Sequence, residues 1–395
     1  MKVKLGDIAV LINGDRGKNY PSQNDIVPNG DIPFVNAGHL DGRTICFDEM
    51  NYISREKYDR LNSGRFIEGD ILYCLRGSLG KKAAVNEGVF GAIASSLVII
   101  RPNREMIDTN YLMFALDSPS IQEQLKRANN GSSQPNLSAA SVRAYDIDLS
   151  SKENQIQIVE RLSMVRAIID SRQKEIECLD DLIKARFVEL FGDVKGNPNN
   201  YPEKAIKTVV ESCEAGWSGN GTQREKKDGE VAVLKISAVT KGYFIPEECK
   251  VLDDQDNIKK RVIPEKGDLI FSRANTREMV GATAIVYQNY PELILPDKLW
   301  KIRFNESVNV FYMKHVLSSK HIRDQFSAVS TGTSGSMYNV SMDKFYGIRI
   351  PVPTIEEQNI FMDFVKQVDK SKAVIQKSLE EAQLLFDSLM QQYFG

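Results

Sequence analysis

The sequence predicts an α+β protein built as a tandem repeat, in which two mixed α/β globular domains are each followed by one long helix. Two observations predict this plan: residues recur at a spacing of 203 positions, and a heptad pattern with few breaks ends each copy. The chain has 395 residues, of which 42% are hydrophobic and 26% are charged. This composition is typical of a globular chain with roughly two to four domains.

The repeat is clearest near the end of each copy. The string Asn136-Leu-Ser138 recurs as Asn339-Val-Ser341, and the string Glu153-Asn-Gln155 recurs as Glu356-Glu-Gln358. Upstream, the run from Gly69 to Arg76 resembles the run from Gly267 to Arg273 once small insertions are allowed. The chain therefore alternates between globular and helical segments.

The repeat divides the chain into four segments. Residues 1–150 and 196–353 form the globular domains, 151–195 the first long helix with the joint after it, and 354–395 the second long helix. Within the globular segments, short β-type runs alternate with Gly, Asn and Asp turns and with short amphipathic helices. This mixture predicts two α/β domains of similar construction.

Each copy ends in a long predicted helix. Neither Pro nor Gly interrupts the heptads of residues 158–190 and 361–393, which predicts coiled-coil helices of about 40 residues, or roughly 60 Å. Two equivalent apolar seams favour pairing of the helices with each other, whereas the alternative is that each helix packs only on its own domain. Charged seam positions at 172, 186 and 372 indicate wet or partner-facing stretches. The predicted seam residues are Leu162, Ile169, Ile176, Ile183, Leu190, Val365, Leu379, Phe386 and Leu389.

Several classes of function are disfavoured by the minority residues and the absent motifs. The five cysteines and three histidines have no zinc-ligand spacing, which predicts reduced thiols, no metal site and no cofactor bound by this chain. Neither a P-loop nor a nucleophile elbow is present, and Asn197–Pro202 only superficially resembles a methyltransferase catalytic loop. No apolar run approaches the roughly 18–20 residues of a membrane span, and no secretory signal opens the chain, so we expect a cytoplasmic protein.

Polar loops are the candidate binding elements in both copies. Arg, Lys, Asn, Gln and Ser are the side chains that read base edges and hold phosphates, although such loops can also be ordinary solvated turns. A net charge of −2 requires any nucleic-acid surface to come from local placement of these residues or from a partner. The first-copy candidates are Arg16, Lys18, Tyr20, Asn36, His39, Arg76, Ser78, Lys81, Lys82, Ser132, Ser133 and Gln134. The second-copy candidates are Trp217, Ser218, Lys235, Ser237, Arg273, Asn275, Thr276, Arg277, Ser334, Ser336 and Tyr338.

Arg76 and Arg273 are the strongest candidates, because each follows an apolar strand at the same place in its copy. The alternative for this pair is a structural salt bridge.

The sequence resembles the specificity (S) subunits of type I restriction–modification systems. The resemblance rests on the repeated strand-and-loop at Gly69–Arg76 and Gly267–Arg273, and on the repeated string that runs from Gly131 to Gln155 and from Gly332 to Gln358. The second copy fits the family pattern better, since Pro353 stands where the first copy has Ser150. The resemblance covers essentially the whole chain.

The resemblance implies a non-catalytic reader of double-stranded DNA. Each globular segment would be a target recognition domain for one half of a bipartite site, and the helices would pair antiparallel and set the half-site spacing. The helix pair would dock two adenine-N6 methyltransferase subunits, which carry S-adenosylmethionine and the catalysis, and a separate translocating endonuclease subunit can join. Two alternatives remain: a specificity subunit of a related fused-nuclease system, and a coiled-coil adaptor whose globular segments bind protein.

Overall fold

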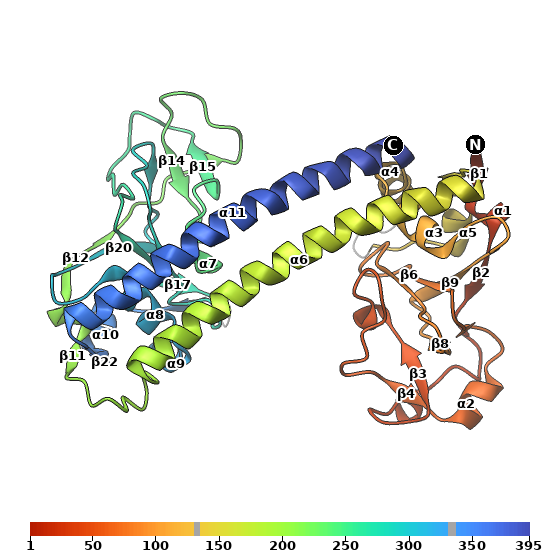
Figure 1. The fold of residues 1–395 in the computed structure, drawn as a ribbon, viewed down its shortest axis with the longest axis horizontal. Helices are drawn as coiled ribbons and strands as arrows, with labels where there is room; N and C mark the ends of the chain where they lie inside the picture. Colours follow the sequence, from red (N-terminus) through yellow and green to blue (C-terminus); the bar gives the residue numbers. More distant parts are fainter. Residues whose placement is uncertain (130–134, 331–336) are drawn as a thin grey trace. The chain divides into compact units, whose positions relative to one another are not determined.

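A computed structural model describes residues 1–129, 135–330 and 337–395. The chain forms two compact units: unit 1 comprises Met1–Gln173 and Lys377–Gly395, and unit 2 comprises Lys174–Gln376. The two long helices, α6 (Lys152–Phe191) and α11 (Ile355–Phe394), each contribute residues to both units (Figure 1). Each unit therefore contains one globular copy and a segment of each helix.

A four-stranded antiparallel sheet forms the centre of each copy, with the same strand order in both. In unit 1 the order is β2-β9-β6-β7, and in unit 2 it is β12-β20-β16-β18. The central strands are continuous apolar runs because both faces of this sheet are covered. The bounds in unit 1 are Ala9–Asn13, Leu97–Pro102, Ile71–Cys74 and Lys82–Ala84. Those in unit 2 are Val210–Ala215, Leu299–Phe304, Leu269–Ser272 and Thr283–Ile285.

A second four-stranded sheet differs between the copies at its edges. Its order is β4-β3-β8-β5 in unit 1 and β13-β15-β14-β19 in unit 2, and β3–β8 and β14–β19 are the parallel pairs. The strand without a counterpart is β5 in the first copy, where it lies beside β8, and β13 in the second copy, where it lies beside β15. The unit 1 bounds are β3 Ile32–Val35, β4 Tyr52–Ile53, β5 Arg65–Phe66 and β8 Gly91–Ile93. The unit 2 bounds are β13 Gly221–Thr222, β14 Ala232–Leu234, β15 Cys249–Leu252 and β19 Leu293–Ile294.

Short helices and two-stranded pairs complete each unit. Helix α4 and helix α9 each begin after a serine, Ser118 or Ser319, whose hydroxyl accepts a backbone N–H of the first turn. The helices are α1 Leu5–Ile8, α2 Arg55–Arg60, α3 Thr109–Ala115, α4 Pro119–Ala128, α5 Ala139–Arg143, α7 Ser237–Thr240, α8 Val310–Ser318, α9 Lys320–Val329 and α10 Met342–Gly347. The short 3-10 turns are Gln23–Asp25, Ala37–His39 and Ile206–Thr208. The remaining strands are β1 Lys2–Lys4, β10 Asp146–Asp148, β11 Glu203–Ala205, β17 Ala274–Asn275, β21 Tyr338–Asn339 and β22 Arg349–Pro351.

The repeated Gly-Asp motif is structural in both copies. Gly69 adopts a φ of 80°, in the left-handed region that favours glycine, and precedes the buried Asp70. The Asp70 carboxylate accepts two hydrogen bonds from Arg101 on the neighbouring strand, at 2.8 and 2.7 Å. In the second copy, Asp268 accepts a 2.7 Å bond from Arg303 in the same way. A buried carboxylate paired with an arginine therefore fixes the start of β6 in the first copy and of β16 in the second.

A buried glutamine joins each long helix to its own copy. The Gln155 Oε1 accepts the backbone N–H of Asp108 at 2.8 Å, and its amide donates to the carbonyls of Met106 and Ser150. Gln358 repeats this arrangement, with the N–H of Asn309 at 2.8 Å and two carbonyl acceptors. Both side chains are fully buried and fully hydrogen-bonded. The repeated Glu-x-Gln string is thus the point where the helix attaches to the domain.

Replacing Gln358 with Leu should lower the free energy of unfolding by roughly 3 kcal/mol, because it leaves one N–H and two carbonyls buried without partners. Chemical denaturation of the full chain measures the loss. The matched control is Gln367→Leu at an exposed position of the same helix, for which we expect a change within about 0.5 kcal/mol. Equal stability of the two variants would contradict this structural role.

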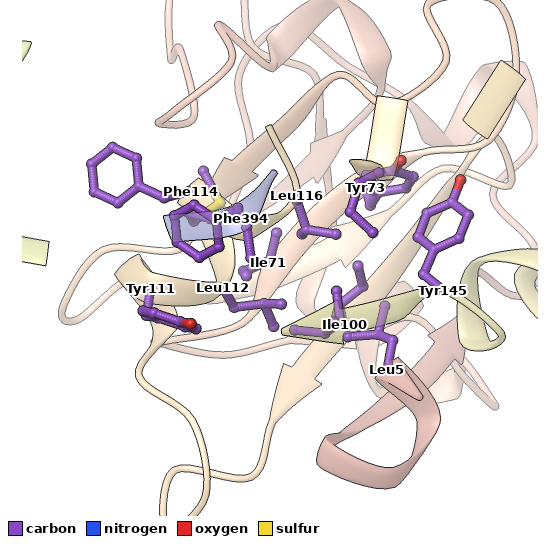
Figure 2. Packing of buried hydrophobic residues seen from close by; sticks show 14 of the residues in the cluster. Leu5, Ile71, Tyr73, Ile100, Tyr111, Leu112, Phe114, Leu116, Tyr145 and Phe394 are labelled. Carbon is purple, nitrogen blue, oxygen red and sulfur yellow. The ribbon is translucent and has the colours of Figure 1, made fainter. Parts of the chain in front are cut away.

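The long helices pair antiparallel within unit 1. Residues from the first half of α6 and the last part of α11 share one apolar cluster, in which Phe394 lies among side chains of α3 and β6 (Figure 2). The Phe394 and Tyr111 ring centroids are 5.1 Å apart, and the Arg166 guanidinium lies 4.1 Å from the Phe386 ring centroid. The helix residues of this cluster are Ile158, Leu162, Val165, Ile169, Ala382, Phe386, Met390 and Phe394.

Unit 2 repeats this pairing with the opposite ends of the helices. Phe187 and Phe191 of α6 pack on Phe361 of α11, with centroid distances of 5.4 and 5.7 Å, and on Tyr312 of α8. An ion pair at 2.7 Å also joins Lys372 to Asp180, so one predicted polar interruption of the seam is a cross-helix contact. The predicted antiparallel coiled coil is confirmed.

Most of the predicted seam is buried where the helices meet. Ile176 is half-buried and belongs to neither apolar cluster, whereas the clusters also include Phe187, Phe191, Met390 and Phe394, which the heptad assignment omitted. These omitted aromatic residues and Met390 lie toward the helix ends, where the globular copy adds a third surface. Predicted members that are buried are Leu162, Ile169, Ile183, Val365 and Phe386; Leu190, Leu379 and Leu389 are half-buried.

His315 on α8 should make the chain less stable in mild acid. Its ring lies between Phe187 and Phe361, with centroid distances of 5.8 and 5.0 Å, and burial together with nearby lysines lowers its pKa to about 3. Below pH 6.5 the unfolded chain binds a proton that the folded chain does not, so stability falls as the pH falls. Between pH 7 and pH 5 we expect His315 to account for a loss of up to about 2 kcal/mol. Denaturation curves at both pH values measure it, and a His315→Gln variant that loses as much stability as the parent chain would contradict the assignment.

Candidate nucleic-acid interface

Two loops predicted separately from the sequence lie side by side in the first copy. The chain leaving β6 forms an isolated bridge between Arg76 and Asn136, and the Leu137 N–H donates to the Leu75 carbonyl at 2.8 Å. The Gly77 N–H also donates to the Pro135 carbonyl at 3.3 Å. We call this junction, residues 75–81 with 135–137, the first reading edge.

The second copy forms the same junction from its own two loops. Strand β17 pairs with β21, matching Ala274 to Asn339, and the Val340 N–H donates to the Arg273 carbonyl at 2.9 Å. This junction, residues 273–280 with 337–340, is the second reading edge. The repeated Asn-x-Ser string therefore serves to join two loops next to the end of a central strand.

Arg76 and Arg273 are not equivalent, contrary to the sequence alignment. Leu97 and Leu299 are the first residues of the corresponding strands β9 and β20. Cys74 is paired with Leu97 and Ser272 with Leu299, so the strand registers match Cys74 to Ser272. Arg76 therefore corresponds to Ala274, and Arg273 to Leu75. A shift of one residue turns a side chain to the other face of an extended chain. Arg76 is exposed, and Arg273 is half-buried.

Arg273 and Ser218 are engaged with the same residue of the second copy. The Arg273 Nε donates to the Asp297 carbonyl at 2.9 Å, and the Ser218 hydroxyl donates to the Asp297 carboxylate. The Trp217 side chain packs partly into the apolar cluster of the second sheet, and its backbone N–H donates to the Leu295 carbonyl. The guanidinium, the hydroxyl and the indole all contribute to the local fold here.

Arg16 and Lys18 are exposed on a loop of the first copy that is held from within. The Asp15 carboxylate accepts the N–H of Gly17 at 2.8 Å and that of Asn62 at 2.7 Å, and these bonds keep its pKa below the usual value. Tyr20 is half-buried, and its hydroxyl accepts the Ser95 N–H. Of the three predicted residues on this loop, Arg16 and Lys18 are exposed and Tyr20 is not.

Asn36 and Lys235 follow corresponding strands, β3 and β14, and both belong to local networks. The Asn36 Oδ1 accepts the Gly38 N–H at 2.8 Å, and the buried His39 Nδ1 accepts the Asn36 N–H at 3.1 Å. Lys235 forms a 2.8 Å ion pair with Glu248, which also accepts the Ser237 hydroxyl at 2.5 Å. These two donors lower the pKa of Glu248.

Lys82 lies in the interior, unlike its neighbours Ser78 and Lys81. Its ammonium is paired with Asp117, and burial lowers its pKa. The strand register places Thr283 at the corresponding position of the second copy, where its hydroxyl bonds that of Ser318 at 3.0 Å. Lys82 therefore has a structural role, since its ion pair joins β7 to the start of α4, whereas Ser78 is exposed and Lys81 is half-buried.

Thr276 and Arg277 are the exposed predicted residues of the second reading edge. Asn275 accepts the Thr276 N–H at 2.8 Å, and its own amide nitrogen is buried without a partner among the described residues. Tyr338 is half-buried beside it. Five predicted residues lie outside the described part of the chain: Ser132, Ser133, Gln134, Ser334 and Ser336.

The described residues contain no group of three or more His, Cys, Asp or Glu side chains placed to hold a metal ion. All five cysteines are free thiols. Within the same residues, no helix is long and apolar enough to cross a membrane. The exposed polar groups at the two reading edges are donors of the kinds that bind base edges and phosphates.

Comparison with known proteins identifies the family. The model described as "Type I restriction modification DNA specificity domain" matches residues 1–179 and 198–384. The specificity subunit of the type I restriction enzyme EcoKI from Escherichia coli K12 is 23% identical over 399 residues, which cover 95% of this chain and 84% of that protein. The MjaVIII specificity subunit from Methanocaldococcus jannaschii is 23% identical and covers 96% and 88%.

The fold agrees with this family. The crystal structure of a type I restriction-modification S subunit from M. genitalium superposes with a TM-score of 0.56 at 15% identity, covering all of this chain and 96% of that one. The predicted α+β fold and the predicted non-catalytic role in DNA specificity are confirmed. This chain belongs to the type I restriction–modification DNA specificity family.

Proposed function

We propose that each globular copy reads one half of a bipartite DNA target, and that the chain directs adenine-N6 methyltransferase subunits to that target. The observation that carries this proposal is the duplicated reading edge, built on the same strand order in both units. Two readers of one construction suit a split site, because half-site spacing then follows from protein geometry. Such a complex acts on cellular DNA in the cytoplasm.

The proposed readers combine exposed donors with a fixed backbone. Arg76 and Ser78 in the first copy, and Thr276 and Arg277 in the second, are exposed next to paired backbone segments. Arginine binds guanine bidentately in the major groove, and Ser or Thr hydroxyls bond several base edges. Because the chain carries a net charge of −2, the partner subunits supply much of the phosphate neutralisation.

The paired helices offer a docking surface for the methyltransferases. Away from their shared seam, they expose large apolar side chains, of which Val374 and Leu384 are 71% and 70% exposed. Large apolar side chains exposed on a helix suit contact with another protein. We propose that two methyltransferase subunits, which bind S-adenosylmethionine, cover it, and that translocating endonuclease subunits join that complex. The full exposed set is Ile156, Met164, Ile168, Leu182, Val188, Ile360, Val374, Leu384 and Leu385.

Substituting Arg76 and Ser78 with Ala tests the reading role in the complex with the methyltransferase. We expect discrimination at the first half-site to fall by about tenfold, since each good base contact contributes roughly 1–3 kcal/mol, while the second half-site stays unchanged. Methylation of duplexes with single base changes measures this. If the chain instead binds a protein partner independently of salt and without DNA, and does not affect methylation, it is a protein-binding adaptor.

A further inference from the structure

The loop after the central strand is longer in the second copy than in the first. Cys74 and Ser272 occupy corresponding strand positions, and both loops end at a glycine, Gly80 or Gly281, packed closely against the helix behind. Five residues lie between these landmarks in the first copy and eight in the second. The three additional residues of the second copy lie within 275–280, and we call residues 276–279 of this stretch the insert loop.

Two side chains of helix α9 bond consecutive carbonyls of the insert loop. The Arg323 Nη2 donates to the Glu278 carbonyl at 2.5 Å, and the Ser327 hydroxyl donates to the Arg277 carbonyl at 3.1 Å. Within the loop, the Val280 N–H donates to the Thr276 carbonyl at 2.9 Å. The loop carbonyls at 276, 277 and 278 are therefore all bonded on the protein side, while the side chains of Thr276 and Arg277 are exposed.

Arg323 makes this contact as a half-buried cation. Among the described residues no carboxylate forms an ion pair with it, and burial lowers the pKa of its guanidinium. Hydrogen bonds from a charged donor to a neutral acceptor are stronger than those between two neutral groups. The positive charge of Arg323 therefore strengthens its hydrogen bond to the Glu278 carbonyl of the insert loop.

Among the described residues of the first copy, no contact corresponds to this one. Gln122 is the fourth residue of α4, as Arg323 is the fourth residue of α9, and each helix begins after a serine cap. The Gln122 amide donates to the Leu116 carbonyl at 3.5 Å, close to the start of its own helix. The difference matches the loops, because the short first loop has no insert to hold.

We propose that Arg323 and Ser327 are positioning residues for the second half-site: they hold the insert loop so that Thr276 and Arg277 meet the DNA in one fixed geometry. This inference rests on the proposed reading function and adds residues that touch no base. Holding a contact residue in place reduces the entropy lost on binding and sharpens discrimination between bases. The first half-site does not depend on such a brace.

The test measures methylation by the complex of the full chain with its methyltransferase, on duplexes carrying single base changes in either half of the target. Arg323→Met keeps the aliphatic stem and removes the donors, and Ser327→Ala removes the second bond. Lys320→Met is the control, since it removes a charge from an exposed position of the same helix. Arg323→Lys retains a donor that can reach the carbonyl. Thermal unfolding of each complex verifies that the variants are folded.

We expect both Arg323→Met and Ser327→Ala to reduce discrimination at the second half-site by about tenfold, with partial rescue in Arg323→Lys and no change in the control or in the first half-site. Unchanged discrimination in both folded variants would overturn the inference, as would equal relaxation of both halves. Retained discrimination with a salt dependence weakened by about one charge would also overturn it, since Arg323 would then contact a phosphate directly. If the parent complex itself shows no sequence preference, the proposed function fails instead.

Discussion

Deleting one heptad from each long helix should shorten the spacing between the two halves of the methylated target by about three base pairs. Seven residues of α-helix span about 10.5 Å, and DNA rises about 3.4 Å per base pair. Residues 173–179 of α6 and 373–379 of α11 are suitable, because the Lys372–Asp180 and Arg166–Phe386 contacts place these segments opposite each other. A deletion of seven preserves the apolar seam.

Mapping the methylated motif of the double-deletion complex measures the new spacing. The half-site sequences should remain as they were, because neither reading edge is altered. A deletion in one helix alone is the control: it mismatches the two seams, and we expect methylation to be lost. A double deletion that methylates the original motif with the original spacing would contradict the role of the helices as a spacer.

Replacing residues 1–150 with the corresponding domain of another family member should exchange one half of the target and leave the other intact. The first copy has its own sheets, its own core and its own reading edge, and it meets the helices of unit 1 through apolar side chains and through backbone groups that bond Gln155. The graft therefore retains the helix surfaces if it preserves the Tyr111 and Phe114 positions that meet Phe394 and Phe386.

The methylated motif of the chimaera gives the answer directly. A motif with a new first half, the same second half and the same spacing is the expected result. A grafted chain that changes both halves, or neither, would show that recognition is not divided between the copies. The reciprocal graft of residues 196–353 should exchange only the other half.

The repeat and the helices could be predicted because each depends on local pattern. Heptads determine the seam, and the Glu-x-Gln string recurs because Gln155 and Gln358 satisfy the same buried backbone groups. The Gly-Asp string was equally visible in the sequence. Its role in pairing Asp70 with Arg101, 31 residues away, depends on which strands are neighbours. A repeated motif can therefore be found without the chemistry that maintains it.

The candidate site was predictable as a set of loops but not residue by residue. A gap of one residue allowed in the alignment made Arg273 appear to match Arg76, although the strand register separates them by one position. Lys82 looked like a surface cation because its partner, Asp117, lies 35 residues away. Arg323 carried no local signal, since it lies within an ordinary capped helix and acquires its role only through the fold that brings the insert loop to α9.

The most direct test maps N6-methyladenine across the DNA of cells that express the neighbouring methyltransferase with this chain, and of cells that express the methyltransferase alone. We expect a split motif that is methylated only when this chain is present. If both proteins are soluble and associated, yet no motif depends on this chain, the chain does not specify the DNA target and the central claim is wrong.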